Sequence, residues 1–405
     1  MLRVAISFLI VGALMSATTH WTRSAPAASY SAQRAASTAS VASLSAPDAA
    51  TRVAAACDMA AAGVAGDQAI ATLVSLLSDD TEVDAATCGA EADFFGSPER
   101  WVRCVTSPAL EAARALAQIG RAALQPLLRA LVDPRASVRR YAVRALGFAE
   151  DEMVRNASVD PLVRTLSDDD ENVRRTAVHV LGRFDDRRAV APLVGALRDR
   201  AVGVRAAAAG TLGHLDDRSA GDALIRALKD EAWQVRQQAA RSLGHRQDED
   251  RVDALAGALR DEHPKVRETA AWALGNVRNA RAVEPLSRAL KDEHAGVREK
   301  SAWGLGQLQD RRAVAVLLIA LSDASADVRS TSAWALGQIR DNSAVSGLAK
   351  ALTDEAWQVR RNAAWALGQV ADGQSWQPLT GALKDQHAEV RKTAAWALGQ
   401  IRGDQ

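Results

Sequence analysis

The chain has 405 residues, of which 48% are apolar and 24% charged, the balance of an ordinary soluble folded protein rather than a disordered or fibrous one. Its 50 Lys and Arg oppose 49 Asp and Glu, and the formal net charge of +1 lacks the strongly basic signature of a nucleic-acid binder, so no nucleic-acid partner is expected. Three cysteines are too few for a scaffold built on disulfides.

The N-terminal segment predicts export. It begins with one basic residue, Arg3, which is followed by a mostly apolar, uncharged run from Val4 to Ala17. A membrane-spanning helix needs about 20 apolar residues, more than this run provides, so we interpret residues 1–27 as a secretory signal peptide and the Ala/Ser-rich residues 28–47 as a flexible linker. The protein is then periplasmic or secreted, with no stable membrane span after cleavage. The alternative is a membrane anchor made by the uncleaved segment.

Residues 48–108 are predicted to form an N-terminal cap and an interrupted first repeat. One helix is expected over residues 51–63. Ala69–Leu77 resembles the first helix of a repeat, and Ala109–Ile119 resembles the second. The stretch between these two segments is predicted to be an insertion.

The insertion carries two of the three cysteines, Cys88 and Cys104. Export would permit oxidation. A Cys88–Cys104 bridge that closes the insertion is the first choice, and pairing of Cys57 with either one is the alternative.

A repeat array is predicted over residues 109–405. After one longer step, the pair Val-Arg recurs with a constant 31-residue period. A Leu-Gly pair begins eight positions after each Val, and an Asp lies five positions before it. The repeat valines are Val138, Val173, Val204, Val235, Val266, Val297, Val328, Val359 and Val390. A fixed period of this length is the signature of a solenoid.

Each repeat is expected to contain two helices. In the first, Val283, Leu286 and Leu290 share one helical face. In the second, Val297, Leu305 and Leu308 share one stripe, so the helix is predicted to run through Gly306. Gly306 would then allow a neighbouring helix to approach closely, while a glycine C-cap at this position is the competing interpretation.

The repeat consensus, AVxPLxxALKDExxxVRxxAAWALGQIxD, resembles the short bacterial HEAT-like repeat that is also found in phycobilin lyases. The resemblance implies an all-α fold, a right-handed α-solenoid of about ten two-helix repeats whose second helices line the concave face. It also implies that an Asp and an Arg six residues apart, such as Asp230 and Arg236, form a structural ladder between units. It is unspecific about function, because the family includes scaffolds, regulators and a few enzymes.

A row of tryptophans is the strongest candidate site. Trp272, Trp303, Trp334, Trp365 and Trp396 each lie six residues after a repeat Val, pointing away from the core stripe, and four residues further on stand Asn276, Gln307, Gln338, Gln369 and Gln400. Indoles flanked by amides suit a binding groove, since they combine rigid apolar area with polar groups. The alternative is that each indole packs on the neighbouring repeat.

The same positions in the earlier repeats carry Arg144, His179, Gly210 and Arg241, and nearby positions carry Arg140, Arg175, Arg183, His214 and His245. The groove is therefore predicted to be cationic in its N-terminal half and aromatic in its C-terminal half, which suits an extended partner with an acidic end. An ordinary solvated charged face is the alternative.

Three further histidines, His263, His294 and His387, fall in the turns between helices. We expect them to be solvated rather than metal ligands, because neighbouring repeats lie about 10 Å apart whereas zinc holds its ligands at about 2 Å. Neither a metal nor another cofactor is expected, and no catalytic residues are assigned.

We therefore expect an exported, non-enzymatic scaffold that binds a protein or extended peptide. The first alternative is a phycobilin-lyase-type enzyme or a chromophore-binding accessory protein. The second is a glycan-binding protein, since indoles and amides also suit sugar stacking.

Overall fold

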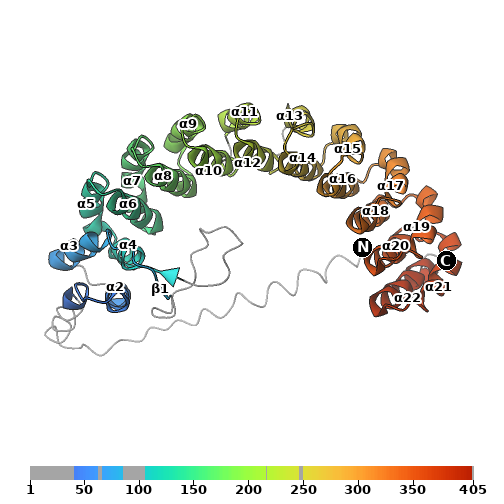
Figure 1. The fold of residues 1–405 in the computed structure, drawn as a ribbon, viewed down its shortest axis with the longest axis horizontal. Helices are drawn as coiled ribbons and strands as arrows, with labels where there is room; N and C mark the ends of the chain where they lie inside the picture. Colours follow the sequence, from blue (N-terminus) through green and yellow to red (C-terminus); the bar gives the residue numbers. More distant parts are fainter. Residues whose placement is uncertain (1–40, 63–65, 85–104, 216, 246–249, 404–405) are drawn as a thin grey trace, which may run out of the picture.

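A computed structural model describes residues 41–62, 66–84, 105–215, 217–245 and 250–403. The described chain is a curved array of helix pairs, with one helix of each pair on the outside of an arc and the other on the inside (Figure 1). The all-α solenoid predicted from the repeat is confirmed. The predicted signal peptide and most of the linker lie outside the described residues.

The helices alternate strictly between the two layers. The outer helices are α3 (Asp67–Leu76), α5 (Arg121–Ala130), α7 (Glu152–Thr165), α9 (Arg187–Ala196), α11 (Arg218–Ala227), α13 (Asp250–Ala258), α15 (Val283–Ala289), α17 (Val314–Ala320), α19 (Val345–Ala351) and α21 (Trp376–Ala382). The inner helices are α2 (Ala49–Ala62), α4 (Pro108–Ile119), α6 (Ala136–Phe148), α8 (Glu171–Phe184), α10 (Val202–Leu212), α12 (Trp233–Leu243), α14 (Pro264–Val277), α16 (Ala295–Leu308), α18 (Ala326–Ile339), α20 (Trp357–Val370) and α22 (Ala388–Gly403). The pairs run from α3 and α4 to α21 and α22, and α2 lies where the extra N-terminal helix was predicted.

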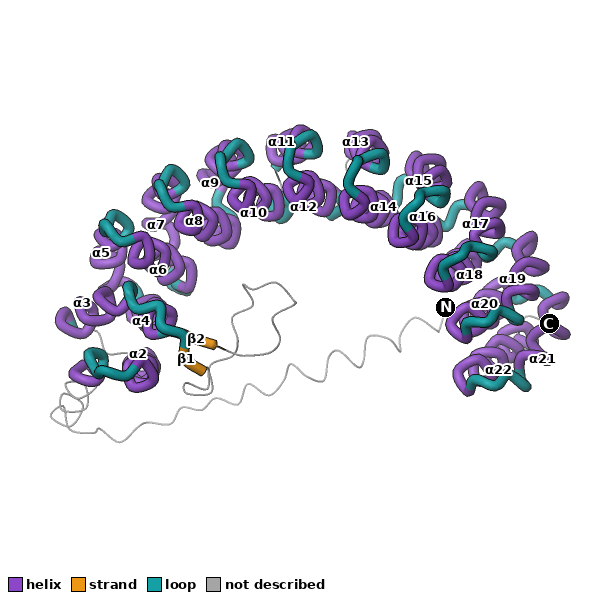
Figure 2. The backbone as a smooth tube through the Cα atoms, in the orientation of Figure 1, coloured by secondary structure: helices purple, strands orange, loops and turns teal. Residues whose placement is uncertain are grey.

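Short elements join these layers. Four 3-10 turns lead into the last outer helices: η2 (Ala280–Ala282), η3 (Arg311–Ala313), η4 (Asn342–Ala344) and η5 (Gly373–Ser375). Two strands that the sequence did not predict, β1 (Val83–Asp84) and β2 (Val105–Thr106), pair antiparallel on either side of the cysteine-containing segment (Figure 2).

Most residues that the periodicity selected are buried, although Leu308, the third member of the predicted stripe in α16, is only half-buried. Val297 and Leu305 are fully buried, and Leu286 on the preceding outer helix is fully buried as well. Helix α16 runs to Leu308, so it continues through Gly306 as predicted, and the chain leaves it at Gln309 in a left-handed conformation (φ 54°). The competing C-cap at Gly306 is thereby wrong.

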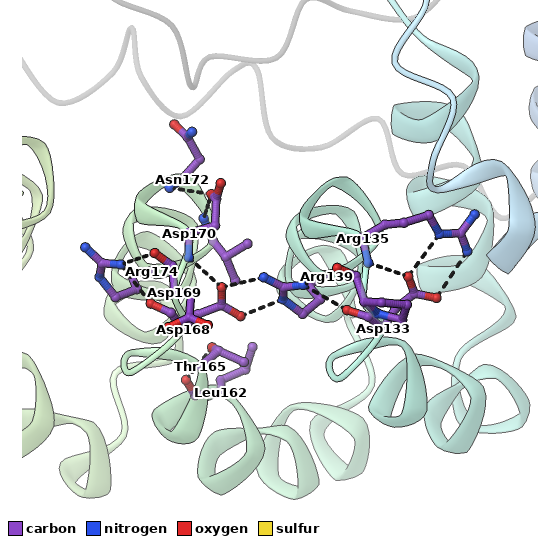
Figure 3. Close-up of polar contacts among 12 residues, drawn as sticks. Asp133, Arg135, Arg139, Leu162, Thr165, Asp168, Asp169, Asp170, Asn172 and Arg174 are labelled. Carbon is purple, nitrogen blue, oxygen red and sulfur yellow. Dashed lines mark hydrogen bonds and ion pairs between the residues drawn. The ribbon is translucent and has the colours of Figure 1, made fainter.

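The predicted Asp–Arg ladder joins successive repeats. Arg139 donates two hydrogen bonds to the carboxylate of Asp168 in the next repeat, from Nε at 2.7 Å and from Nη2 at 2.8 Å (Figure 3). Its Nη1 donates to the backbone carbonyls of Asp133, at 2.8 Å, and Pro134, so one guanidinium also fixes its own turn. Such two-pronged pairing is the strongest form of this interaction.

The same rung recurs along the arc, where each ladder arginine from Arg174 to Arg360 pairs with the aspartate of the following repeat. Its further pairs are Arg174–Asp199, Arg205–Asp230, Arg236–Asp261, Arg267–Asp292, Arg298–Asp323, Arg329–Asp354 and Arg360–Asp385. The role implied by the resemblance, a structural link between units, is therefore confirmed.

Candidate functional site on the concave face

The concave face is lined by the inner helices, as the family resemblance implied (Figure 1). Its chemistry therefore follows from the inner-helix positions that point away from the outer layer. The structure places the predicted cationic residues in or directly after the inner helices α6 to α12, and the predicted tryptophans in the inner helices α14 to α22.

The tryptophan row is partly packed between repeats. Trp272, Trp303, Trp334 and Trp365 are half-buried, and Trp396 in the last helix is 40% exposed. Each indole lies over the glycine of the preceding Leu-Gly pair. A Cβ built on Gly306 would lie 2.7 Å from Cζ3 of Trp334, and one built on Gly337 would lie 2.6 Å from Cζ3 of Trp365.

In these repeats the next indole occupies part of the space that a side chain on the repeat glycine would need. Where no indole follows, at Gly147, Gly182 and Gly213, other side chains of the next inner helix occupy that space. The alternative interpretation, in which each indole packs on the neighbouring repeat, accounts for the burial of one edge of each indole ring. The remaining accessible ring surface is what a partner could contact, and the assignment of these tryptophans to partner binding stays a prediction.

The amide row is tied into the same surface. Gln338 accepts a hydrogen bond from Nε2 of Gln309 at 3.4 Å, and Gln369 accepts one from Nη2 of Arg340 at 2.6 Å. Gln307 and Asn276 are half-buried, and Gln400 is exposed. The amides therefore lie beside the indoles, with part of their hydrogen-bonding capacity used by the neighbouring repeat.

A hollow of about 830 Å³ lies on the concave face over α8, α10 and α12, within the half predicted to be cationic. The residues lining it are Arg175, His179, Gly182, Arg183, Gly203, Ala206, Ala207, Gly210, Thr211, His214, Gln238, Arg241, Ser242 and His245. A volume of this size is typical of a ligand site. Three arginines and three histidines line it, and we refer to it as the α10 hollow.

The hollow exists because α10 lacks large side chains on its concave side. Gly203, Ala206, Ala207 and Gly210 occupy positions where α8 has Asn172, Arg175, Thr176 and His179, and where α12 has Gln234, Gln237, Gln238 and Arg241. Larger side chains from both neighbours lean over this floor. The Arg175 side chain passes 3.7 Å from a Cβ built on Gly203, and Oε1 of Gln238 lies 3.8 Å from one built on Gly210.

The histidines in the hollow report its electrostatic environment. Desolvation inside the arc, followed by the nearby charge of Arg175, lowers the pKa of His179, although its side chain remains accessible to solvent. Desolvation, followed by the charges of His214 and Arg241, lowers the pKa of His245. Desolvation is the larger cause of both shifts, and the neighbouring cations add to it because they also disfavour the charged form of a histidine.

Two of the predicted cationic residues do not join this group. Arg140 donates to the Asp80 carboxylate at 2.6 Å, and the Tyr141 hydroxyl donates to the same carboxylate, which ties α6 to the segment after α3. The Arg144 guanidinium carbon lies 5.7 Å from the centre of the Tyr141 ring. Arg144 was predicted to bind the partner, but it is not among the residues that line the hollow.

The small residues of the floor were not predicted, apart from Gly210. The sequence carries a signal for them in the run GVRAAAAG over residues 203–210 of α10, which departs from the repeat where other units have larger side chains. A break in a repeat is where a site is expected, and the consensus concealed it because Val204 and Arg205 still fit the pattern.

The turn histidines differ from one another. His294 is exposed, as expected. His263 and His387 are half-buried, because each imidazole stacks on a tryptophan with ring centres 4.0 Å apart, on Trp233 and Trp357 respectively. Among the described residues, no three His, Cys, Asp or Glu side chains are grouped to hold a metal ion.

The predicted cysteine bridge lies largely outside the described residues. Cys88 and Cys104 lie outside the described residues, and so does the bridge first expected between them. Cys57 in α2 is disulfide-bonded, and a cysteine forms only one bridge. Pairing through Cys57, the alternative, is therefore favoured.

In the described part of the chain, no helix is long and apolar enough to cross a membrane.

Comparison with known proteins identifies related repeats. The family model for HEAT repeats matches overlapping segments that together cover residues 124–405, and the model for the PBS lyase HEAT-like repeat matches residues 109–133. No curated protein matches the chain.

Solved structures share the architecture. A Kap95:Nup1 complex matches with a TM-score of 0.59 and 15% identity, covering 92% of this chain and 61% of the other; a structure of Kap95p with RanGDP matches with a TM-score of 0.58 and 15% identity, covering 91% and 60%. An engineered protein matches at 21% identity with a TM-score of 0.45, covering 90% and 98%. The chain spans about 60% of the two Kap95 structures, and identities this low show the fold alone.

Proposed function

The chain belongs to the family of HEAT-repeat proteins, and from this premise we propose that it is a non-enzymatic scaffold that holds an extended segment of a protein partner along its concave face. The observation that carries the proposal is the continuity of that face. Partly accessible indoles and amides line one half, and a cationic hollow lies in the other. Rigid aromatic groups with polar neighbours are the usual anchors of protein interfaces.

The Kap95 structures support the same interpretation, since the complexes that they describe pair a solenoid of this architecture with another protein.

We further propose that residues 1–27 direct export. N-terminal sequencing of the protein recovered from the cell envelope or the medium tests this proposal, and an intact Met1 in that fraction would contradict cleavage.

The binding function is tested by selecting extended peptides from a random display library against the full chain and comparing two double variants. Gln338→Glu with Gln369→Glu places two charges on the concave face with little change in shape. Gln374→Glu with Gln377→Glu, at exposed positions in or next to α21, is the matched control. We expect the concave variant to weaken the selected peptides at least about tenfold, which corresponds to about 1.4 kcal/mol, and the control to leave them unchanged.

Equal binding to both variants would contradict the assignment to the concave face.

The match to the PBS lyase HEAT-like repeat supports a second candidate, a phycobilin-lyase-type or chromophore-binding protein. If no peptide is selected while a linear tetrapyrrole acquires a shifted absorption band on mixing, that candidate replaces the scaffold. Glycan binding would replace it if a glycan array gives the only signal.

A further inference from the structure

We propose that the α10 hollow binds a cluster of carboxylates, so that it recognises the acidic segment of an extended peptide. This inference rests on the proposed function, because it specifies which part of the partner lies in which half of the groove. The hollow is a place where the repeat pattern is interrupted, and the interruption leaves space as well as charge.

The space arises in α10, at the repeat position that carries an indole in the C-terminal repeats. In the C-terminal repeats, an indole covers the glycine of the preceding repeat, and Gly275, Gly306, Gly337 and Gly368 are all buried beneath one. At α10 the indole position is Gly210, so no indole reaches Gly182, which is only half-buried and lines the hollow. The missing side chain therefore opens the groove at a single repeat.

The charge comes from both walls. Arg175 and Arg183 extend from α8 and Arg241 from α12, and none of the described residues that line the hollow is an Asp or a Glu. Nη2 of Arg175 donates at 3.0 Å to the neutral amide oxygen of Asn172, and the Arg241 guanidinium carbon lies 6.0 Å from the centre of the Trp272 ring. These contacts orient the two guanidinium groups without neutralising them.

This arrangement contrasts with the ladder arginines of the same helices, Arg174, Arg205 and Arg236, each of which is paired with an aspartate. The positive charge of the ladder is cancelled inside the protein, whereas the contacts of Arg175 and Arg241 given above are to an amide oxygen and an indole ring, which leave their charge available to a ligand. Guanidinium groups bind carboxylates through two parallel hydrogen bonds, which gives them both strength and orientation.

The size of the hollow favours several carboxylates over one small anion. About 830 Å³ exceeds what a single oxyanion fills, and its cations come from two different helices with a Gly/Ala floor between them. An acidic stretch of peptide could lie across this floor, with successive side chains reaching α8 and α12. The peptide could then continue along the concave face toward the indoles.

The test measures binding of fluorescein-labelled peptides to the full chain by anisotropy at low and moderate salt. The probes are a hexaglutamate peptide, its hexaglutamine counterpart and a peptide in which phosphoserines replace the glutamates. We expect the hexaglutamate peptide to bind, the glutamine peptide to bind at least tenfold more weakly, and added salt to weaken the acidic peptide. Preference for the phosphoserine peptide by more than tenfold would replace carboxylate recognition by phosphate recognition.

Two variants test separately whether binding depends on the charge of the hollow and on its open space. Arg175→Gln with Arg241→Gln removes two cations and should weaken hexaglutamate binding at least tenfold. Gly210→Trp restores the indole position of the other repeats and should fill the hollow over Gly182 while retaining every cation. A Cβ at residue 210 meets only Oε1 of Gln238, at 3.8 Å, so this substitution starts without a backbone clash.

The matched control is Arg155→Gln with Arg187→Gln, which removes two exposed arginines from the outer helices α7 and α9. It should change hexaglutamate affinity less than twofold. If it weakens binding as much as the hollow variant does, or if Gly210→Trp binds like the wild type, general charge attraction explains the binding and the proposal is wrong. Circular dichroism melts of each variant show whether it is folded.

This readout does not need the native partner. If the protein binds hexaglutamate through the hollow but selects no extended peptide, the acidic site is supported and the proposed scaffold function is contradicted. The reverse outcome would retain the scaffold and remove the acidic site.

Discussion

At the scale of single residues, glycine has two opposite roles in this chain. At the Leu-Gly position it makes room for the edge of an indole, and in α10 it leaves a hollow that no protein atom fills. The two roles belong to different positions of the repeat, since Gly306 is part of a Leu-Gly pair and Gly210 stands where the C-terminal repeats have Trp. Substitution by alanine therefore distinguishes them.

We predict that Gly306→Ala destabilises the protein and Gly210→Ala does not. A Cβ on Gly306 would lie 2.7 Å from Cζ3 of Trp334 and 2.9 Å from Cα of Ala335, so overpacking should cost about 1–3 kcal/mol. A Cβ on Gly210 meets no such obstacle, so the higher helix propensity of alanine should add up to about 1 kcal/mol. Thermal melts should shift in opposite directions; a rise in Tm for Gly306→Ala would refute the packing role.

At the scale of elements, the ladder makes the turns between helices sensitive to acid. Burial raises the pKa of Asp168, but hydrogen bonds from Arg139 and from the Asp170 backbone outweigh it, so the pKa lies below the ordinary value. The pKa values of Asp199, Asp292, Asp323, Asp354 and Asp385 are lowered in the same way by their arginine and backbone donors. The carboxylate form is thus favoured by folding.

We predict that stability falls only slightly from pH 7 to about pH 5, because the unfolded chain protonates His179 and His245 more readily than the folded chain does, and falls steeply below about pH 4 as the ladder aspartates are protonated. An aspartate whose pKa is lowered by folding contributes stability at pH values above its unfolded-state pKa of about 3.9. This contribution is lost as the pH falls through its folded-state pKa. Melting temperatures measured from pH 7 to pH 3 check this. Asp292→Asn should melt lower at pH 7 and lose less on acidification, because one titrating group is gone; an unchanged pH slope would contradict the role of this rung.

The last inner helix, α22, has fewer described partners than the inner helices before it. Nη1 of Arg391 donates to the backbone carbonyls of Asp385 and Gln386, but no carboxylate of the described residues pairs with it. A Cβ on Gly399 would meet nothing within 4 Å, whereas the equivalent glycines earlier in the array are covered.

We predict that amide hydrogens in α22 exchange faster than those in α16 and α18, because a repeat in a solenoid is stabilised mainly by its neighbours and α22 has one described neighbour fewer. Hydrogen exchange measured by mass spectrometry on peptides from each helix tests this. Uniform protection from α16 to α22 would indicate that something covers the end of the array.

At the scale of the whole molecule, the sequence predicted the architecture and part of the site. The repeat period, the helix pair and the continuation of α16 through Gly306 all followed from patterns that one repeat imposes on the next. The α10 hollow did not follow, because it depends on how the side chains of α8 and α12 lean over small residues of another helix. The stacking of His263 on Trp233 was missed for the same reason, since it joins two repeats.

We predict an elongated shape in solution. Ten repeats at about 10 Å each give an arc with a contour on the order of 100 Å. A compact chain of this length would have a radius of gyration of about 22 Å, and small-angle scattering should give a clearly larger value. A value near that of a compact sphere would be incompatible with the open arc of Figure 1.

The uniform rung also makes the repeats interchangeable modules. Deleting one complete unit, for example residues 295–325, would remove Arg298 together with its partner Asp323 and would keep the rungs Arg267–Asp292 and Arg329–Asp354 on either side. A duplicated unit would likewise bring its own arginine and aspartate. Genes for such chains can therefore gain or lose copies by recombination, and the reach of the arc can change in whole modules while every internal joint keeps its chemistry.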